Sequence, residues 1–347
     1  MGTSRMREIM TMNKKAYIYI NYPNIVVLKC YLDVVKAALT KNGYSCEYVK
    51  DLRQISKTDL IVFSLGKDAY KYYHKGYRNY ILWQQGVTAE ESYLRHKSNI
   101  RRVILNYIDV YAMKKAKIIL YVSSLLRCYY EKVGQCSFKE KSYIMPCFNE
   151  SLRDIDLSQK EYNKFRFTYV GSLSVWQCFD ETLHIYKRIE EIVPNASIKI
   201  LTLQENEAKE RAKKIGIKNY EIKSVPQEQV RQELKDISYG FVFRKNNIVN
   251  RVATPTKFSS YLAAGVLPIY STCLRDFCRA TRKMNIALPL DDNNAGKIAQ
   301  NIIDFINLEK NKSLIESEII KLFSIYYSKE YHAEELSKIV NALATNR

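Results

Sequence analysis

The residues best suited to chemistry lie in a short segment near position 260. The stretch TPTKFSSYLAAG runs from Thr254 to Gly265. Thr254 is a good helix N-cap, Pro255 suits a first helical position, and Gly265 is typical of the residue that follows a helix. A helix start presents free backbone N–H groups, and Lys257 in the first turn adds a full positive charge. The segment predicts an anion site, such as one for phosphate; the alternative is an ordinary capped helix with a solvated lysine.

The elements that must position this segment follow from periodicity. Short apolar runs alternate with longer segments of 3.6-residue period, which is typical of a parallel sheet covered by helices. In the first half, strands are expected at 16–20, 44–49, 59–65, 80–83, 117–122 and 142–145, with helices at 25–41, 100–115 and 124–133. In the second half, strands are expected at 166–170, 197–203, 220–223, 240–243 and 267–270, with helices at 180–192, 205–215, 227–234 and 256–264, and three more from 295 onward.

Two domains are expected because 347 residues exceed one ordinary core. We predict an α/β protein of two Rossmann-like, doubly wound domains facing a cleft. The first covers 1–148, a polar linker covers 149–164, and the second covers 165–327; the helix 328–347 is a candidate to pack back on the first domain. Ligands of such sheets bind beyond the carboxyl ends of the strands. The loop after the first strand, 21–24, reads NYPN and lacks a dinucleotide fingerprint, which disfavours a dehydrogenase.

The net charge of +19 is concentrated in the first 150 residues, which hold 25 basic and 12 acidic residues against 30 and 24 in the rest. Nucleic acid, an anionic membrane surface and a compositional bias could each account for it. The sequence has no recognisable nucleic-acid module, so anionic lipid or a phosphorylated substrate is the better interpretation. Lys71–Tyr80 interleaves bases with tyrosines, as suits a membrane interface, although an ordinary tyrosine-rich helix has the same composition. No signal peptide or apolar span of about 18 residues occurs, and the eight cysteines are scattered, so we expect a cytoplasmic protein, peripheral at the inner face of the membrane.

The string TPTKFSSYLAAGVLPIYS resembles the donor-site stretch of retaining glycosyltransferases of the GT-B fold, the class that builds polysaccharides and lipopolysaccharides. Upstream, 167–176 (FTYVGSLSVW) resembles the strand and glycine turn that open the donor domain in that family. The segment 223–230 (KSVPQEQV) resembles its base-binding loop and helix, and 240–250 (GFVFRKNNIVN) resembles the strand and loop before the donor helix. In the first half, 82–94 (LWQQGVTAEESYL) is similar to an acceptor-side strand and loop.

The resemblance implies a nucleotide-diphosphate sugar, with UDP or GDP, as substrate, and neither a cofactor nor a metal. A departing diphosphate must be stabilised by preorganised donors and cations. Because residues 171–177 contain no basic side chain, the cations are expected elsewhere, with Arg244, Lys245, Arg251 and Lys257 as the candidates. The expected donor-binding residues are Gly171, Ser172, Val225, Arg244, Arg251, Thr256, Lys257 and Ser260.

The acceptor side is expected around 82–96. Gln85 and Gly86 are candidates for backbone contacts, and Glu90 or Glu91 for orienting an acceptor hydroxyl or acting as a base. A solvated turn or the start of a helix is the alternative for these two acids. His96 is the one histidine expected to take part in the reaction. Together with Glu90, Arg244 and Lys257, it completes the expected catalytic set.

Two positions depart from the family pattern. The family's donor helix carries one acid that holds the ribose and another, eight residues earlier, that contacts the sugar; Ser260 and Val252 stand there. From the resemblance we expect a hexosyltransferase that acts on a glycan or lipid-linked acceptor. The two missing acids favour the alternative, a homologue that has lost catalysis and binds a glycan or protein partner. A sugar-nucleotide epimerase is a third possibility, but it would need acid and base side chains that the sequence does not place.

Overall fold

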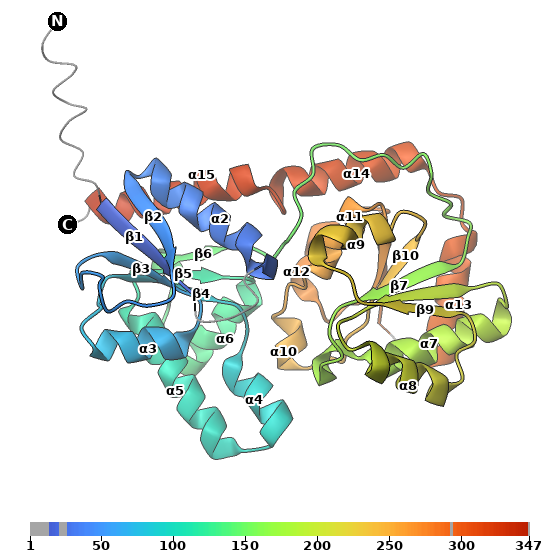
Figure 1. Cartoon of the computed structure of the whole chain (residues 1–347), viewed down its shortest axis with the longest axis horizontal. Coiled ribbons are helices and arrows are strands. Elements are labelled where there is room, and N and C mark those ends of the chain that lie inside the picture. Colours follow the sequence, from blue (N-terminus) through green and yellow to red (C-terminus); the bar gives the residue numbers. More distant parts are fainter. Residues whose placement is uncertain (1–13, 21–25, 292–293, 346–347) are drawn as a thin grey trace, which may run out of the picture. The chain divides into compact units, whose positions relative to one another are not determined.

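The computed structural model describes residues 14–20, 26–291 and 294–345 (Figure 1). The chain divides into two compact units. Unit 1 comprises residues 1–146 together with 329–347, and unit 2 comprises 147–328. Unit 1 is therefore built from two separate stretches of sequence. The loop 21–24, expected to lack a dinucleotide fingerprint, lies outside the described residues.

Unit 1 is built on a six-stranded parallel sheet of strand order β2-β1-β3-β4-β5-β6. Its strands are β1 (Lys14–Tyr19), β2 (Tyr44–Val49), β3 (Leu60–Phe63), β4 (Tyr80–Gln84), β5 (Ile118–Tyr121) and β6 (Ser142–Ile144). The central strands β3, β4 and β5 are buried along their whole length. Such continuous apolar runs are typical of parallel strands with helices on both faces.

Seven helices belong to unit 1 within the described residues. They are α2 (Val26–Lys41), α3 (Gly66–His74), α4 (Thr88–His96), α5 (Asn99–Lys115), α6 (Ser124–Gly134), a short 3-10 turn (Lys139–Lys141) and α15 (Lys329–Thr345). The last, α15, packs against α2 (Figure 1). Lys41 Nζ lies 2.6 Å from Glu334 Oε2, and Asn42 Nδ2 donates to Ser337 Oγ at 3.0 Å.

Unit 2 repeats the architecture with strand order β12-β11-β10-β7-β8-β9, again all parallel. Its strands are β7 (Arg166–Val170), β8 (Ser197–Leu201), β9 (Tyr220–Lys223), β10 (Tyr239–Val242), β11 (Leu267–Ser271) and β12 (Leu288–Leu290). Its helices are a 3-10 turn (Val175–Gln177), α7 (Phe179–Ile192), α8 (Glu205–Ile215), α9 (Gln227–Glu233), α10 (Ile248–Arg251), α11 (Lys257–Ala263), α12 (Arg275–Thr281), α13 (Ala295–Asn307) and α14 (Lys312–Ile325).

Each sheet reverses its strand order once. In unit 2 the chain builds β8 and β9 on one side of β7 and then returns to place β10 on the other. Loops that leave β7 and β10 therefore run in opposite directions, and ligands of doubly wound sheets bind at the carboxyl ends of such a strand pair. Gly171 follows β7 and Arg244 follows β10, so both lie at this switch point.

The predicted α/β, doubly wound architecture is confirmed, and most strands lie within two residues of their expected bounds. The expected acceptor-side loop is wrong in part, because Thr88–His96 forms helix α4. The helices α3 and α12 and the strand β12 were not predicted. The segment 149–164 belongs to unit 2, where Ile155, Leu157 and Tyr162 are buried. It is thus part of that unit's packing and does not behave as a free linker.

Candidate functional site

The glycine turn after β7 is the first part of the site in unit 2. Gly171 has φ +130°, a conformation that side chains rarely adopt. Its backbone N–H donates to the Leu201 carbonyl at 2.9 Å. Tyr169 Oη donates to the Ser172 carbonyl at 2.7 Å and so holds the far side of the turn. Gly171 is one of the expected donor-binding residues, and its backbone N–H is therefore already bonded within unit 2.

Helix α11 is fixed across the switch point by one buried tyrosine. The pairing of β7 with β10 ends at Thr168 and Gly240. Beyond it, the Val170 N–H donates to Tyr261 Oη at 3.0 Å. A Cβ on Gly240 would lie only 2.4 Å from the Tyr261 ring, so only glycine lets the ring come this close. Tyr261 thereby sets where the first turn of α11 lies.

Lys257, in that first turn, is a buried cation without a hydrogen-bond partner. Its side chain is 7% exposed, and Nζ is completely covered. Nζ lies 3.9 Å from the centre of the Tyr169 ring, a close cation–π contact. A Cβ on Gly171 would lie 2.9 Å from Lys257 Cε, so the glycine makes room for the lysine. Burial, and then the charge of Arg244, lower the pKa of Lys257 well below its ordinary value.

Arg244 is the second buried cation of the site, at 5% exposure. Its guanidinium donates to the Gln177 carbonyl at 2.8 Å and to the Phe243 carbonyl at 2.9 Å, and it also bonds the Gln177 side chain. Burial lowers its pKa, but an arginine keeps its charge at neutral pH. Arg244 therefore contributes a fixed positive charge and holds the turn that follows Gly171.

Gly171, Arg244 and Lys257 thus meet at the carboxyl end of β7 and β10. Arg244 is satisfied by protein oxygens, whereas Lys257 has spare donors and no carboxylate partner. Water-excluding surroundings strengthen the attraction of such cations for an anion. The arrangement can stabilise negative charge that approaches or develops beside the glycine turn.

The expected cap of α11 is wrong in detail. Thr256 is the residue before the helix, and its side chain makes no capping bond. Thr254 Oγ1 instead accepts from the Cys147 N–H at 3.0 Å. The expected stop is confirmed, because Gly265 has φ +68° and its N–H bonds the Leu262 carbonyl.

The remaining residues considered for donor binding have other partners, are buried or are exposed. Ser260 Oγ donates to Asn149 Oδ1 at 2.9 Å, so this hydroxyl is held by unit 2 itself. Val252, at the other position where an acid was considered, is fully buried. Arg251 is exposed at the end of α10, and Lys245 pairs with Glu181.

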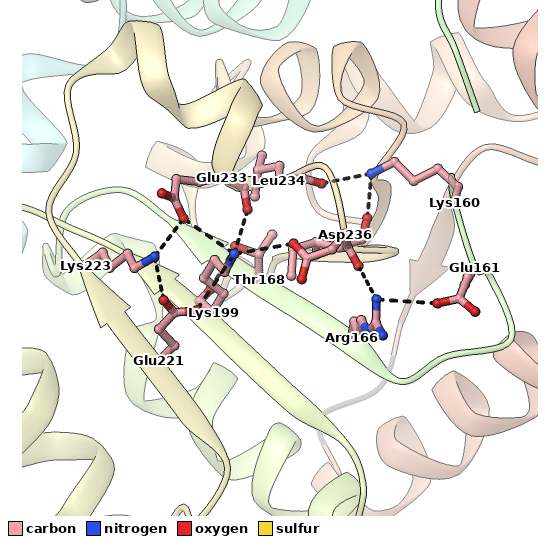
Figure 2. Close-up of polar contacts among 11 residues, drawn as sticks. Lys160, Glu161, Arg166, Thr168, Lys199, Glu221, Lys223, Glu233, Leu234 and Asp236 are labelled. Carbon is pink, nitrogen blue, oxygen red and sulfur yellow. Dashed lines mark hydrogen bonds and ion pairs between the residues drawn. The ribbon is translucent and has the colours of Figure 1, made fainter. Parts of the chain in front are cut away.

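Val225 lies half-buried in the loop between β9 and α9. An ion pair links the strand before this loop to the helix after it. Lys223 at the end of β9 pairs with Glu233 at the end of α9, at 3.2 Å. Lys199 of β8 reaches the same Glu233 at 3.5 Å and Asp236 at 3.4 Å (Figure 2). This network fixes the loop that carries Val225 against the sheet.

Lys160 fastens the same region from the segment before β7. Its Nζ donates to the carbonyls of Leu234 and Ile237 at 2.9 and 2.7 Å (Figure 2). Burial lowers the pKa of Lys160 to about 8. Lys160 differs from Lys257 in that its buried nitrogen has protein acceptors, so it has a structural role.

The acceptor-side candidates lie in unit 1. Glu90 is 6% exposed and forms an ion pair with Arg102 at 2.7 Å, and Tyr129 donates to it at 3.0 Å. His96 lies exposed at the other end of α4. The expected catalytic set is therefore divided, with Glu90 and His96 on unit 1, and Arg244 and Lys257 on unit 2.

Glu91 is the second acid of α4, and it does not share the ion pair that holds Glu90. Its Oε1 lies so close to Gly86 that a Cβ there would be 2.5 Å away, and burial raises its pKa. Gln85 Nε2 donates to the Ser64 carbonyl at 3.2 Å, so that side chain supports the neighbouring strand end.

A buried carboxyl beside these residues was missed in the sequence. Asp109 of α5 is 2% exposed, and Tyr130 donates to it at 2.9 Å. Burial raises the pKa of Asp109 to about 6. Its apolar neighbours in α5 gave no signal, since one acid in a helical pattern is usually exposed. Tyr169 and Gln177, which hold the two cations of unit 2, were missed in the same way.

Comparison with known proteins identifies the fold. The chain is similar to Anabaena HepE, solved with UDP and glucose, at 10% identity and a TM-score of 0.66, over 95% of this chain and 99% of that one. It is also similar to sucrose-phosphate synthase from Thermosynechococcus elongatus, at 9% identity and a TM-score of 0.66, over 96% of this chain and 100% of that one. A third similar structure is WaaG, a glycosyltransferase involved in lipopolysaccharide biosynthesis, at 10% identity and a TM-score of 0.58, over 94% of this chain and 99% of that one.

No family model matches the chain, and no curated protein matches its sequence. The structural neighbours are GT-B glycosyltransferases, and the chain has the GT-B fold, as the resemblance in its sequence implied. Among residues 14–20, 26–291 and 294–345, no three or more His, Cys, Asp or Glu side chains are grouped to hold a metal ion. No helix within those ranges is long and apolar enough to cross a membrane.

Proposed function

We propose that this protein is a glycosyltransferase that moves a hexose-type sugar from a nucleotide-diphosphate donor, with UDP or GDP, to a glycan or lipid-linked acceptor. The observation that carries the proposal is Lys257. A fully buried ammonium without an acceptor, beside a glycine turn at the switch point of a GT-B sheet, calls for an anionic ligand. HepE, a protein of similar fold, is bound to UDP and glucose, which supports a nucleotide sugar as that ligand.

In this proposal the diphosphate lies against the Gly171 turn, and the two cations act differently. Arg244 supplies charge that is present before the ligand arrives. Lys257 leaves the face of Tyr169 and pairs in its protonated form with the phosphate. As the bond between sugar and phosphate breaks, negative charge grows on the leaving diphosphate, and both cations stabilise it.

The transfer is proposed to retain the anomeric configuration. The leaving phosphate oxygen would accept the proton of the acceptor hydroxyl, so no separate nucleophile is required. Glu91 and Gly86 of unit 1 are proposed to contact the acceptor, whereas Glu90 is held by Arg102 and Tyr129. We also propose that the protein acts in the cytoplasm and that its site takes no metal.

Calorimetry with UDP, GDP and their sugars tests the proposal. We expect micromolar binding of one nucleotide diphosphate, at least tenfold weaker in Arg244→Gln. Absence of binding by every nucleotide would refute a donor site. NMR of the product's anomeric proton then distinguishes retention from inversion.

A non-catalytic binding protein is the second candidate, and Ser260 is the observation that favours it. The position lacks the family's acid, and its hydroxyl is held by Asn149. Slow release of nucleotide diphosphate from the sugar donor in the absence of acceptor distinguishes the two. An active enzyme releases it above the uncatalysed rate, whereas a binding protein leaves the donor intact.

A further inference from the structure

A row of apolar side chains is exposed along one face of α5 in unit 1. Ile100, Val103, Ile104 and Tyr107 are 77%, 68%, 53% and 60% exposed. Their spacing of three, four and seven residues places them within an arc of about 100° on the helix. The large exposed apolar side chains Leu203 and Leu308 of unit 2 lie apart in the sequence, in the connections that follow β8 and α13. We name these four residues the α5 face.

The charge around the α5 face has one sign. From residue 92 to 108 the chain has no Asp or Glu, and it carries Arg95, Lys97, Arg101 and Arg102. Lys97 and Arg102 lie over the ring of Tyr93, at 5.7 and 5.3 Å from its centre. An apolar row bordered by cations is the pattern of a helix that lies at the surface of an anionic bilayer.

Aromatic side chains extend the α5 face toward α3, which packs against α5. The rings of Tyr107 and Tyr111 are 6.1 Å apart, and Tyr111 in turn contacts Tyr70 at 5.2 Å and stacks on His74 at 5.4 Å. Lys115 lies 5.9 Å from the Tyr111 ring. Tyrosine and lysine together suit the headgroup layer, where one end of the side chain is apolar and the other is wet.

The N-terminal turns of α5 also project. In Figure 1, α4 and the start of α5 extend away from the sheet of unit 1 as a helical hairpin. The buried residues of α5 begin only at Asp109. The first ten residues of this helix therefore present side chains that the sheet does not cover.

We propose that the α5 face is a membrane-binding surface, which inserts into the interfacial layer of a bilayer rich in anionic lipid. The apolar row enters the boundary between headgroups and acyl chains. Arg95, Lys97 and Arg101 contact the headgroup phosphates, and Tyr111 and Tyr70 lie at the rim. The inference assigns a location to the membrane partner that charge alone suggested, and it does not rest on the nucleotide site.

Vesicle binding by the full-length protein tests the α5 face. Wild type and the variant Ile100→Asn/Ile104→Asn are sedimented with vesicles of phosphatidylcholine alone or mixed with phosphatidylglycerol, at low and high salt. The matched control is Leu203→Asn/Leu308→Asn, which removes two apolar side chains of unit 2 that are 81% and 65% exposed. We expect wild type and control to bind anionic vesicles in a salt-sensitive manner, and the α5 variant to bind at least about tenfold more weakly.

A second measurement covers the case of a variant that folds poorly. In Ile104→Trp the added indole should be quenched by brominated anionic lipid, whereas Leu203→Trp should not respond. The proposal is overturned if the α5 variant binds as wild type, if neutral vesicles bind equally well, or if the wild type ignores vesicles and instead dimerises through this face. Failure of nucleotide calorimetry with vesicle binding intact would refute the donor site and leave the α5 face standing.

Discussion

A buried lysine with no acceptor opposes the stability of the fold that contains it. Lys257 is charged in the unfolded chain, but burial lowers its pKa in the folded state. Each unit of such a shift costs about 1.4 kcal/mol at pH values below the folded pKa. A cation kept at that cost, at the switch point of the sheet, is best understood through the ligand it would hold.

Replacement of this charge should separate stability from binding. We expect Lys257→Met to raise the stability of unit 2 by about 1–3 kcal/mol at neutral pH, because methionine fills the same space without a charge. The same variant should lose nucleotide binding. Thermal melting and calorimetry measure the two effects, and Lys213→Met, at an exposed position in the last turn of α8, is the control that should leave nucleotide affinity unchanged. Loss of stability together with unaltered affinity would refute the role given to Lys257.

Binding of the nucleotide should take up a proton. An anion beside Lys257 raises its pKa back toward the ordinary value, so at pH values above the pKa of the free state the bound state holds a proton that the free state has lost. Affinity should therefore fall as the pH rises between the free and the bound pKa of this lysine. Calorimetry in buffers of different ionisation enthalpy measures the uptake. Lys257→Arg keeps a permanent charge and should abolish the buffer dependence, and a slope of zero in wild type would contradict the prediction.

The sequence alone made Lys257 a candidate for anion binding, because its place in the first turn of a short helix was visible locally. What makes it unusual was not visible. Tyr169 and Gly171, which cover its ammonium, lie more than 80 residues earlier, and no periodicity reports a contact at that separation. Asn149, which holds Ser260, was similarly assigned to a linker because the segment is polar.

Among the elements, α11 depends on one glycine for its position. The Tyr261 ring lies so close to β10 that Gly240 admits no Cβ. The ring's hydroxyl then bonds the last residue of β7, so a shift of the ring moves Lys257 as well.

Gly240→Ala should therefore destabilise unit 2 by about 2–4 kcal/mol and weaken nucleotide binding. Urea unfolding and calorimetry are the measurements. Gly296→Ala is the matched control, because its added Cβ would meet only a side-chain oxygen of Asn294, at 3.2 Å, in the first turn of α13. Equal stability of the two variants would show that the Tyr261 ring can move aside.

Strands were predicted better than helices, for a physical reason. A buried parallel strand is a continuous apolar run, and the runs at β4, β5 and β7 are plain in the sequence. Helix α4 buries Ala89 and the acid Glu90, and the acid is compensated by Arg102 of the next helix. Such a helix has no apolar stripe, so its sequence reads as a polar loop.

At the scale of the whole molecule, unit 1 depends on a helix that follows unit 2 in the sequence. Leu336 of α15 is fully buried, and Tyr143 Oη and His332 Nδ1 lie 2.7 Å apart. Leu336→Ala should cost unit 1 about 2–5 kcal/mol. Hydrogen exchange should show faster exchange in β1, β2 and α2, with unit 2 unchanged. Lys338→Ala, at an exposed position of the same helix, is the control, and equal loss of protection in both units would show that they unfold as one.

The separation of unit 1 into two stretches also sets an order of events during translation. Residues 147–328 leave the ribosome as one continuous piece, so unit 2 has everything it needs before α15 is made. The first 146 residues must wait, with the face of α2 that α15 covers still open to other chains. We therefore expect unit 2 to complete its folding before unit 1 does.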